Sequence, residues 1–302
     1  MPNTFVKPSE VVDAANLLLQ REIVLPRTVR SMPESNFVGA LNDTVTRRIP
    51  ATLAARTRTM RSTTGLTADD LAESSVPVVL DEHIYSLLNL TDEQLKLDIV
   101  DLSRQVLQPQ MRAVAEGLEN VIAAAIAGAT LTGGSVAMAE GTDEPYKVAV
   151  AARKALNDLD VPRSGRILLL GSAVEAAFLN DDRLSKVNES GSSSALRDAI
   201  IGRVAGFTVL GSNAIGENEA YAYHPDAFVF VSAAPMVPAG ASEGATVTNE
   251  GFSMRYLRDY NPTNSTGPVD RSLVDSFVGC SSTDDGAGDT NPRGVEIAFT
   301  AA

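Results

Sequence analysis

The segment from Thr44 to Leu88 constrains the fold of this chain most strongly, because it has strand-type patterns but little apolar surface to bury. Thr44–Ile49 is rich in β-branched residues, and residues 57–65 continue in the same style up to a glycine turn. Residues 75–80 provide a return strand, and Pro77 within it is typical of a sheet edge. The pattern predicts a long polar hairpin.

Charge is segregated along this hairpin, with five arginines on the outgoing limb and acids on the return limb. The outgoing limb shows no apolar face with which to pack on the protein's own core. A solvated, internally salt-bridged hairpin and contact with phosphates are two alternatives. We favour contact with carboxylates of a neighbouring subunit, because the planar guanidinium pairs bidentately with carboxylates. Arg outnumbers Lys by 20 to 5, a bias expected of interfaces. The candidate contact residues are Arg47, Arg48, Arg56, Arg58, Arg61, Asp69, Asp70 and Glu73.

The strongest helix pattern runs from Thr91 to Gly128. A capping sequence begins at Thr91, and apolar residues then recur at helical spacing. Pro109 interrupts the pattern, so we expect a break or kink near Gln108. Residues 110–128 should form one long helix of about five turns that ends at the glycine.

Shorter patterns predict the other elements. Ser9 is an N-cap signal for a helix that ends before Pro26. Beyond residue 131, helices and short apolar strands alternate, which is typical of an α/β unit. Strand patterns return near the end of the chain, but periodicity does not decide between strand and helix for residues 272–280. The predicted helices are 145–159, 172–179 with Ser172 as N-cap, and 194–201; the predicted strands are 166–171, 207–210, 227–231, 251–260 and 295–299.

Composition excludes several classes of protein. The 302 residues suffice for one large domain or two ordinary ones, and the net charge of −13 argues against a dedicated nucleic-acid-binding protein. Cys280 is the only cysteine, so no internal disulfide forms, and with His83 and His224 alone it cannot complete a closed zinc site. The chain shows no secretion signal, and no apolar run approaches the ~18 residues of a membrane span. We expect a soluble protein made in a reducing compartment.

No sequence motif indicates a catalytic or metal-binding site. Gly240–Gly244 matches the G-x-S-x-G pattern around Ser242, but no histidine follows His224 in the chain. An acidic loop from Asp285 fits a calcium loop only in part, because Ala and Thr occupy a ligand slot and the required glycine position. A solvated turn is favoured there, and a weak cation site between subunits stays open. We expect no catalytic residues, no cofactor and no protein-held metal.

The order of parts resembles the major capsid (coat) proteins of tailed bacteriophages with the Hong Kong 97 type fold. Residues 195–213 resemble the axial-domain segment of that family, and residues 223–231 resemble its following strand. Residues 252–260 and 270–279 are similar to the closing strands of its peripheral domain, and residues 11–30 are similar to the podovirus-like coat branch. The resemblance covers nearly the whole chain.

This resemblance implies an α+β fold with an N-terminal arm, an extended β-hairpin loop, a peripheral domain with a long spine helix, an α/β axial domain and a C-terminal segment. The implied boundaries are 1–43 for the arm, 44–90 for the extended loop, 91–144 and 249–280 for the peripheral domain, 145–248 for the axial domain, and 281–302 for the C-terminal segment.

The resemblance also implies a structural role without enzymatic activity. Such proteins self-assemble as hexamers and pentamers into an icosahedral head around double-stranded DNA, by way of a scaffolded procapsid that expands. The implied partners are other copies, a scaffolding protein, a portal protein and, where one exists, a decoration or cementing protein. Assembly takes place in the host bacterial cytoplasm, and the product is the virion capsid.

Some relatives secure the shell with Lys–Asn crosslinks, but the hairpin here has no lysine. Arg–carboxylate contacts or a cementing protein would then secure it. Two alternatives to the capsid role are an encapsulin-like compartment shell and an α/β hydrolase-type enzyme.

Overall fold

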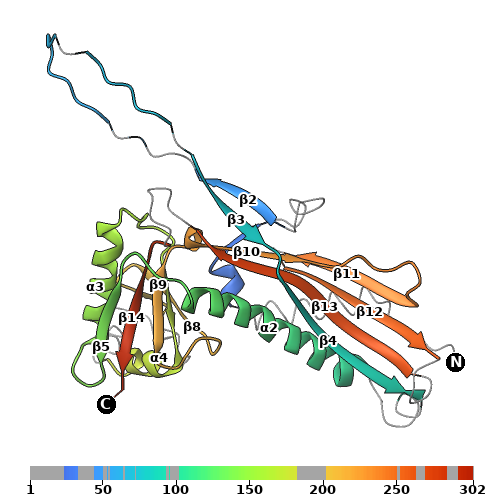
Figure 1. Cartoon of the computed structure of the whole chain (residues 1–302). Helices are drawn as coiled ribbons and strands as arrows, with labels where there is room; N and C mark the ends of the chain where they lie inside the picture. The colour runs from blue at the N-terminus through green and yellow to red at the C-terminus, as the bar shows by residue number, and fades with distance from the viewer. Residues whose placement is uncertain are drawn as a thin grey trace.

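The computed structural model describes residues 24–32, 44–49, 53, 55–63, 65–71, 73–92, 95, 102–181, 202–249, 252–262, 269–283 and 292–301. Two six-stranded sheets with their helices form the body, and a narrow hairpin extends far beyond it (Figure 1). Three predicted features lie outside the described residues: the helix that begins at Ser9, the helix over residues 194–201, and the acidic loop at Asp285.

The sheet with the longer strands, called the long sheet here, has the strand order β1-β10-β13-β12-β11, and β4 also pairs with β13. β13 is antiparallel to β4, β10 and β12, so it is the central strand. β13 includes residues 272–280, for which periodicity did not decide between strand and helix, and these residues form a strand. The strands are β1 Arg30–Met32, β4 Glu82–Thr91, β10 Phe228–Ala233, β11 Glu243–Asn249, β12 Phe252–Asn261 and β13 Val269–Ser282.

One long helix, α2, covers one face of the long sheet (Figure 1). It runs over Gln108–Ala127, close to the predicted range, and follows a π-helical turn at Ser103–Leu107. Pro109 lies in the first turn of α2, directly after the π-helical turn, and its missing N–H interrupts the regular backbone hydrogen bonds there. The expected break therefore takes the form of a change from π to α geometry. The buried apolar residues on α2 recur three or four positions apart and face the sheet: Met111, Val114, Leu118, Ile122 and Ile126.

A buried glutamine fixes the position of α2 on the long sheet. The Nε2 group of Gln110 donates to the carbonyl oxygens of Ser86 in β4 and Ser272 in β13, at 3.1 and 2.9 Å. Its Oε1 accepts from the hydroxyl of Ser272 at 2.7 Å. These bonds replace the hydration that Gln110 loses on burial, so sliding α2 along the sheet would leave buried polar groups unpaired.

The second sheet, called the short sheet here, has the order β5-β14-β9-β6-β8-β7 and mixes parallel with antiparallel pairs. All four residues of β6 are buried, as expected for an uninterrupted apolar run. The strands are β5 Ser135–Ala139, β6 Ile167–Leu170, β7 Arg203–Val204, β8 Phe207–Gly211, β9 Glu219–Tyr223 and β14 Gly294–Thr300.

Two helices belong to the short sheet, α3 over Pro145–Asp158 and α4 over Ser172–Leu179, and both confirm their predictions. α3 packs against β14 and β5 through buried side chains that include Val148 and Leu156. The predicted cap of α4 is wrong: its N-cap residue is Gly171, and Ser172 is the first helical residue. A third, short 3₁₀ helix, η7, spans Pro225–Ala227.

The chain crosses between the two sheets more often than its sequence pattern indicates. Residues 82–91, predicted as part of the hairpin, instead form β4 of the long sheet. β5 and the C-terminal β14 pair in the short sheet, whereas β10 returns to the long sheet. No strand was predicted for β5, whose sequence Ser-Val-Ala-Met-Ala has little strand propensity, so its pairing with β14 determines its conformation.

The described N-terminal segment is bonded to both halves of the body. Beside η1 (Leu25–Arg27), the N–H of Val24 donates to Glu119 of α2 at 2.8 Å, and β1 pairs parallel with β10. The hydroxyls of Thr28 and Tyr223 of β9 share a buried hydrogen bond of 2.8 Å. Burial raises the pKa of Tyr223, so its hydroxyl stays neutral. This segment therefore connects the long sheet, α2 and the short sheet.

The base of the hairpin is a two-stranded antiparallel sheet of β2 (Thr44–Ile49) and β3 (Ser74–Val79), which confirms the outgoing and return strands. The predicted strand over residues 57–65 is wrong, because no described residue between β2 and β3 is in a strand. A two-stranded ribbon far from the body has no core to cover, and such ribbons are marginal in water.

The hairpin is anchored on the face of the long sheet opposite α2, called the outer face here. Side chains alternate along β10, so Phe228 and Phe230 lie in the core beneath α2. Val229 and Val231 point the other way and pack with the fully buried Val78 of β3. The hairpin base is therefore part of a small core on the outer face.

A glycine in β13 allows β3 to cross the outer face closely, which gives a stability prediction. A Cβ on Gly279 would overlap the carbonyl oxygen of Val79. We expect Gly279→Ala to lower the free energy of unfolding by about 1–3 kcal/mol, the usual cost of overpacking, in urea denaturation. Gly65→Ala is the control, because nothing lies within 4 Å of a Cβ there, and it should change stability by less than about 0.5 kcal/mol. Equal stability of the two variants would contradict this packing.

Candidate functional site: the extended loop and its surroundings

The segment between β2 and β3, called the extended loop here, projects away from both sheets (Figure 1). At its tip the N–H of Ser62 donates to the carbonyl of Thr59 at 3.2 Å, and Arg61 has a φ of 64°, so the chain reverses in a tight turn. Nearly all its described residues are exposed. The body therefore gives this loop no support beyond the hairpin base.

The structure places the predicted contact residues on both limbs of the hairpin. Arg56 of the outgoing limb forms an ion pair with Asp69 of the return limb. The guanidinium of Arg58 donates to the carbonyl oxygen of Ser62 near the tip. Arg47 and Arg48 lie in β2, Arg61 lies in the tip turn, and Asp70 and Glu73 follow Asp69 on the return limb.

Several loop charges remain available for another surface. Within the described chain, no carboxylate pairs with Arg48, Arg58 or Arg61, and all three side chains are exposed. The Arg56–Asp69 pair is largely exposed as well, and such pairs contribute little stability in water. The same charges contribute more where a second surface removes water from them.

Sequence reasoning missed the apolar side chains of the loop. Leu53, Met60, Leu66 and Leu71 are all exposed, Met60 to 90%. Their spacing matches neither a strand nor a helix period, so no pattern pointed to them. Large apolar side chains gathered on one exposed element are typical of an interaction surface. The extended loop therefore combines cationic and apolar groups.

A buried carboxylate lies in the long sheet where β4 begins. Asp275 of β13 is fully buried and accepts from the Nε of Arg255 in β12 at 2.9 Å. His83 of β4 contacts the other carboxylate oxygen through Nε2 at 3.0 Å, and its ring packs against Phe277 with centroids 4.8 Å apart. A buried charge needs such partners, so His83 has a structural role.

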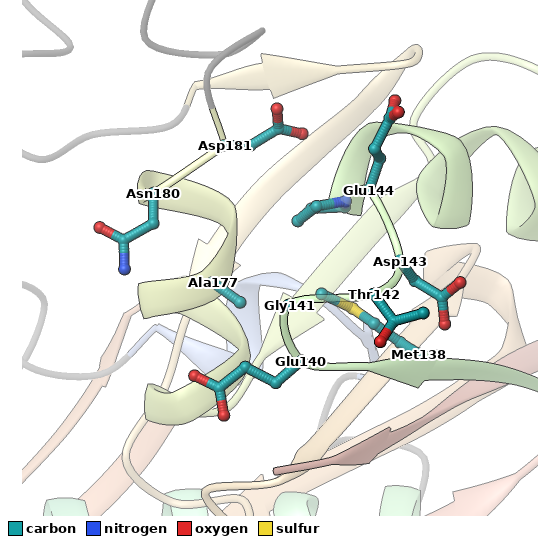
Figure 2. Close-up of a pocket in the computed structure, with 10 residues that line it drawn as sticks. Met138, Glu140, Gly141, Thr142, Asp143, Glu144, Ala177, Asn180 and Asp181 are labelled. Carbon is teal, nitrogen blue, oxygen red and sulfur yellow. The ribbon is translucent and has the colours of Figure 1, made fainter. Parts of the chain in front are cut away.

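A hollow of about 520 Å³ lies where the end of β5 meets α3 and α4 (Figure 2). Asp143 accepts from the N–H of Ala139 at 2.8 Å, and Asp181 accepts from the N–H of Tyr146 at 3.2 Å. Figure 2 shows the carboxylates pointing in different directions. Among the described residues no three potential ligands cluster as a metal site requires. The acids around the hollow are Glu140, Asp143, Glu144 and Asp181.

The G-x-S-x-G match has no catalytic geometry. Ser242 lies in a loop that enters β11, whereas a nucleophile elbow needs a strand-to-helix turn.

The described part of the chain contains no helix with the length and apolar character to cross a membrane.

Solved structures with the same overall fold come from viral and virus-like shells. A structure from Mycobacterium phage Che8 matches with a TM-score of 0.62 at 17% identity, over 91% of this chain and 90% of that one. The capsid of the cyanophage P-SCSP1u matches with a TM-score of 0.60 at 11% identity, over 91% and 86%. A virus-like particle from Pyrococcus furiosus matches with a TM-score of 0.51 at 11% identity, over 96% of both chains. These likenesses confirm an α+β fold of the Hong Kong 97 type, that of shell-forming proteins.

A family model for phage capsid protein matches residues 86–269, more than half of the chain. The chain belongs to this family and is a phage capsid protein. Members of the family are structural proteins, not enzymes, so the hydrolase alternative is wrong. No curated protein matches the chain.

The single thiol gives a prediction about the base of the hairpin. The side chain of Cys280, which follows Gly279 in β13, is half-buried, and this burial, with Asp81 nearby, raises the pKa of its thiol to about 12. The thiolate is the reactive form, so alkylation of the folded protein at about pH 8 should be roughly a thousand times slower than in urea. Mass spectrometry of iodoacetamide-treated protein measures both rates. Equal rates would contradict the burial of this site.

Proposed function

We propose that the chain assembles as hexamers and pentamers into the phage head that encloses double-stranded DNA. Assembly begins as a procapsid around a scaffolding protein, and the shell expands as DNA enters. Membership of the capsid family supports this role, together with an extended loop whose exposed charged and apolar groups suit contact with another subunit. The protein acts through its interfaces.

In this proposal each of the two sheets belongs to a different domain. The long sheet with α2 serves as the peripheral domain, and the short sheet with α3 and α4 serves as the axial domain. This assignment moves β4, β10 and β11 to the peripheral domain, and β5 and β14 to the axial domain, relative to the sequence-based boundaries. Residues 1–43 act as the N-terminal arm.

The extended loop lies over the adjacent subunit in the assembled shell. There Arg47, Arg48, Arg58 and Arg61 pair with carboxylates, which the chain holds in excess at a net charge of −13. Arg56 and Asp69 instead hold the two limbs together. Asp70 and Glu73 contact the neighbour from the return limb.

The remaining partners follow from the same role. A portal protein occupies one vertex, a cementing or decoration protein can bind outside, and assembly takes place in the host cytoplasm. The shell holds DNA without reading its sequence, since a surface with excess negative charge repels phosphates.

Charge reversal in the loop tests this role. We expect Arg56→Glu with Arg58→Glu to leave a folded subunit that forms no shells when expressed with its scaffolding protein. The reversal at position 58 places like charges across the interface, and the reversal at position 56 breaks the pair with Asp69 that holds the two limbs of the loop together. Lys147→Glu with Lys154→Glu is the control, since it makes the same charge change on the exposed face of α3 and should leave assembly intact. Electron micrographs measure the outcome. Normal particles from the loop variant would rule out a role for these arginines.

An encapsulin-like compartment is the second candidate, because the match to the Pyrococcus furiosus particle covers nearly all of both chains. A compartment shell closes without scaffold and encloses a cargo protein. We expect the phage-type shell to require scaffold for uniform closure. Uniform, cargo-filled shells from the chain without scaffold would favour the compartment.

A further inference from the structure

Arginines gather at the end of the short sheet where α3 stops and β6 starts. Arg153 lies in the second half of α3, Arg163 in the loop that follows, and Arg166 directly before β6. Arg153 donates to the carbonyl oxygen of Ala205 at 2.7 Å, which joins α3 to the turn between β7 and β8, and Arg203 lies in β7. We call Arg153, Arg163, Arg166 and Arg203 the arginine cluster.

The arginine cluster holds more positive charge than its surroundings neutralise. Arg166 is buried, and its four acceptors are all neutral oxygens, from three backbone carbonyls and one side-chain amide. Burial lowers the pKa of Arg166, and the nearby charges of Arg153 and Arg163 lower it further. Arg163 and Arg203 are exposed, and none of the described acids forms an ion pair with the cluster; Asp158 at the end of α3 pairs with Lys154 instead.

Acids gather at the opposite end of α3, around the hollow in Figure 2. Glu144 is the N-cap residue of α3, Asp143 precedes it, and Asp181 accepts from the N–H of Tyr146 in the first turn. Glu140 lies in the turn that follows β5. We call these four acids the acidic rim. The 14 residues of α3 hold the rim and the arginine cluster about 21 Å apart, so the two cannot meet within one copy.

The dipole of α3 stabilises both sets of charges while they are apart. A helix favours negative charge near its N-terminus and positive charge near its C-terminus. The acidic rim surrounds the N-terminus of α3, and the arginine cluster lies at its C-terminal end. A free subunit can therefore keep two complementary charged surfaces at the two ends of one helix.

We propose that the arginine cluster of one copy binds the acidic rim of the next, so that copies join head to tail. A contact between two different surfaces of the same chain closes a ring when the rotation between copies fits. Figure 2 shows the rim carboxylates pointing in different directions, which suits several guanidinium groups better than one ion. Tyr146 and Leu179, each 39% exposed, adjoin the rim, and guanidinium groups also stack on aromatic rings. This inference rests on the proposed assembly in rings and adds side chains that join the copies.

An exchange of charges between the two surfaces tests this contact. Arg163→Glu with Arg203→Glu should lower the yield of particles, in expression with the scaffolding protein, at least about tenfold, because acids then face the rim. Glu140→Arg with Asp143→Arg should lower it similarly from the other side. All four substitutions together restore opposite charges and should return most of the yield. Lys147→Glu with Lys154→Glu is the control, because these lysines of α3 belong to neither set, and it should leave the yield unchanged.

Engineered disulfides give a second measurement that does not depend on charge. Glu140→Cys with Arg163→Cys should give a ladder of covalent oligomers from oxidised particles on a non-reducing gel. A bond within one copy is excluded, because the two positions lie beyond opposite ends of α3 and a disulfide spans at most about 7 Å between Cα atoms. Met236→Cys with Arg163→Cys is the control, since Met236 is 88% exposed but belongs to neither set, and it should give no ladder.

The outcomes separate this inference from the proposed function. Normal particles from either two-residue charge variant, or particles of the cysteine pair without a ladder, would overturn the inference and leave the capsid role intact. Normal particles from the arginine variant that hold less DNA would overturn it in favour of phosphate binding by the cluster. Failure of the unaltered chain to assemble with its scaffold would instead contradict the proposed function.

Discussion

The rest of the structure depends on the packing of α2 across one face of the long sheet. Leu118, Ile122 and Ile126 are completely buried there, and each apolar side chain removed from water contributes about 1.5–3 kcal/mol. The helix covers only that face. The outer face is covered at its β10 end by Val78, whereas Tyr85 and Leu87 of β4 stay exposed. The one-sided core therefore leaves apolar side chains on the surface of the subunit.

The distribution of charge follows the same division. The body is acidic, and its buried carboxylate Asp275 is neutralised locally by Arg255. The extended loop carries Arg58 and Arg61 near its tip, and no described carboxylate of the same subunit pairs with them. In the assembly that we propose, these cations meet carboxylates of an adjacent copy. This arrangement favours association over collapse of the loop onto its own sheet.

Elements with a buried face and a regular period could be predicted from the sequence. The stripe on α2 and the apolar run of β6 repeat at the spacing that their burial requires. β4 could not be assigned, because residues 82–91 fit a hairpin limb as well as a sheet strand, and only their register with β13 distinguishes the two. β5 was missed because its small residues become a strand only through pairing with β14.

The candidate site was predictable only in its charges. The segregated arginines and acids of the hairpin are visible in the sequence, and the Arg56–Asp69 pair needed the fold of the loop. The exposed Met60 of the loop and the exposed Tyr85 and Leu87 of β4 gave no signal, because exposure depends on which face the body leaves open. Which apolar side chains remain on the surface depends on how the core packs.

A reconstruction by electron cryomicroscopy of the particles or capsomers that the chain forms tests the account most directly. The proposed assembly predicts rings of five and six copies in which the extended loop of each copy lies over the adjacent copy. Monomers alone, or a loop folded back on its own body in every copy, would contradict it.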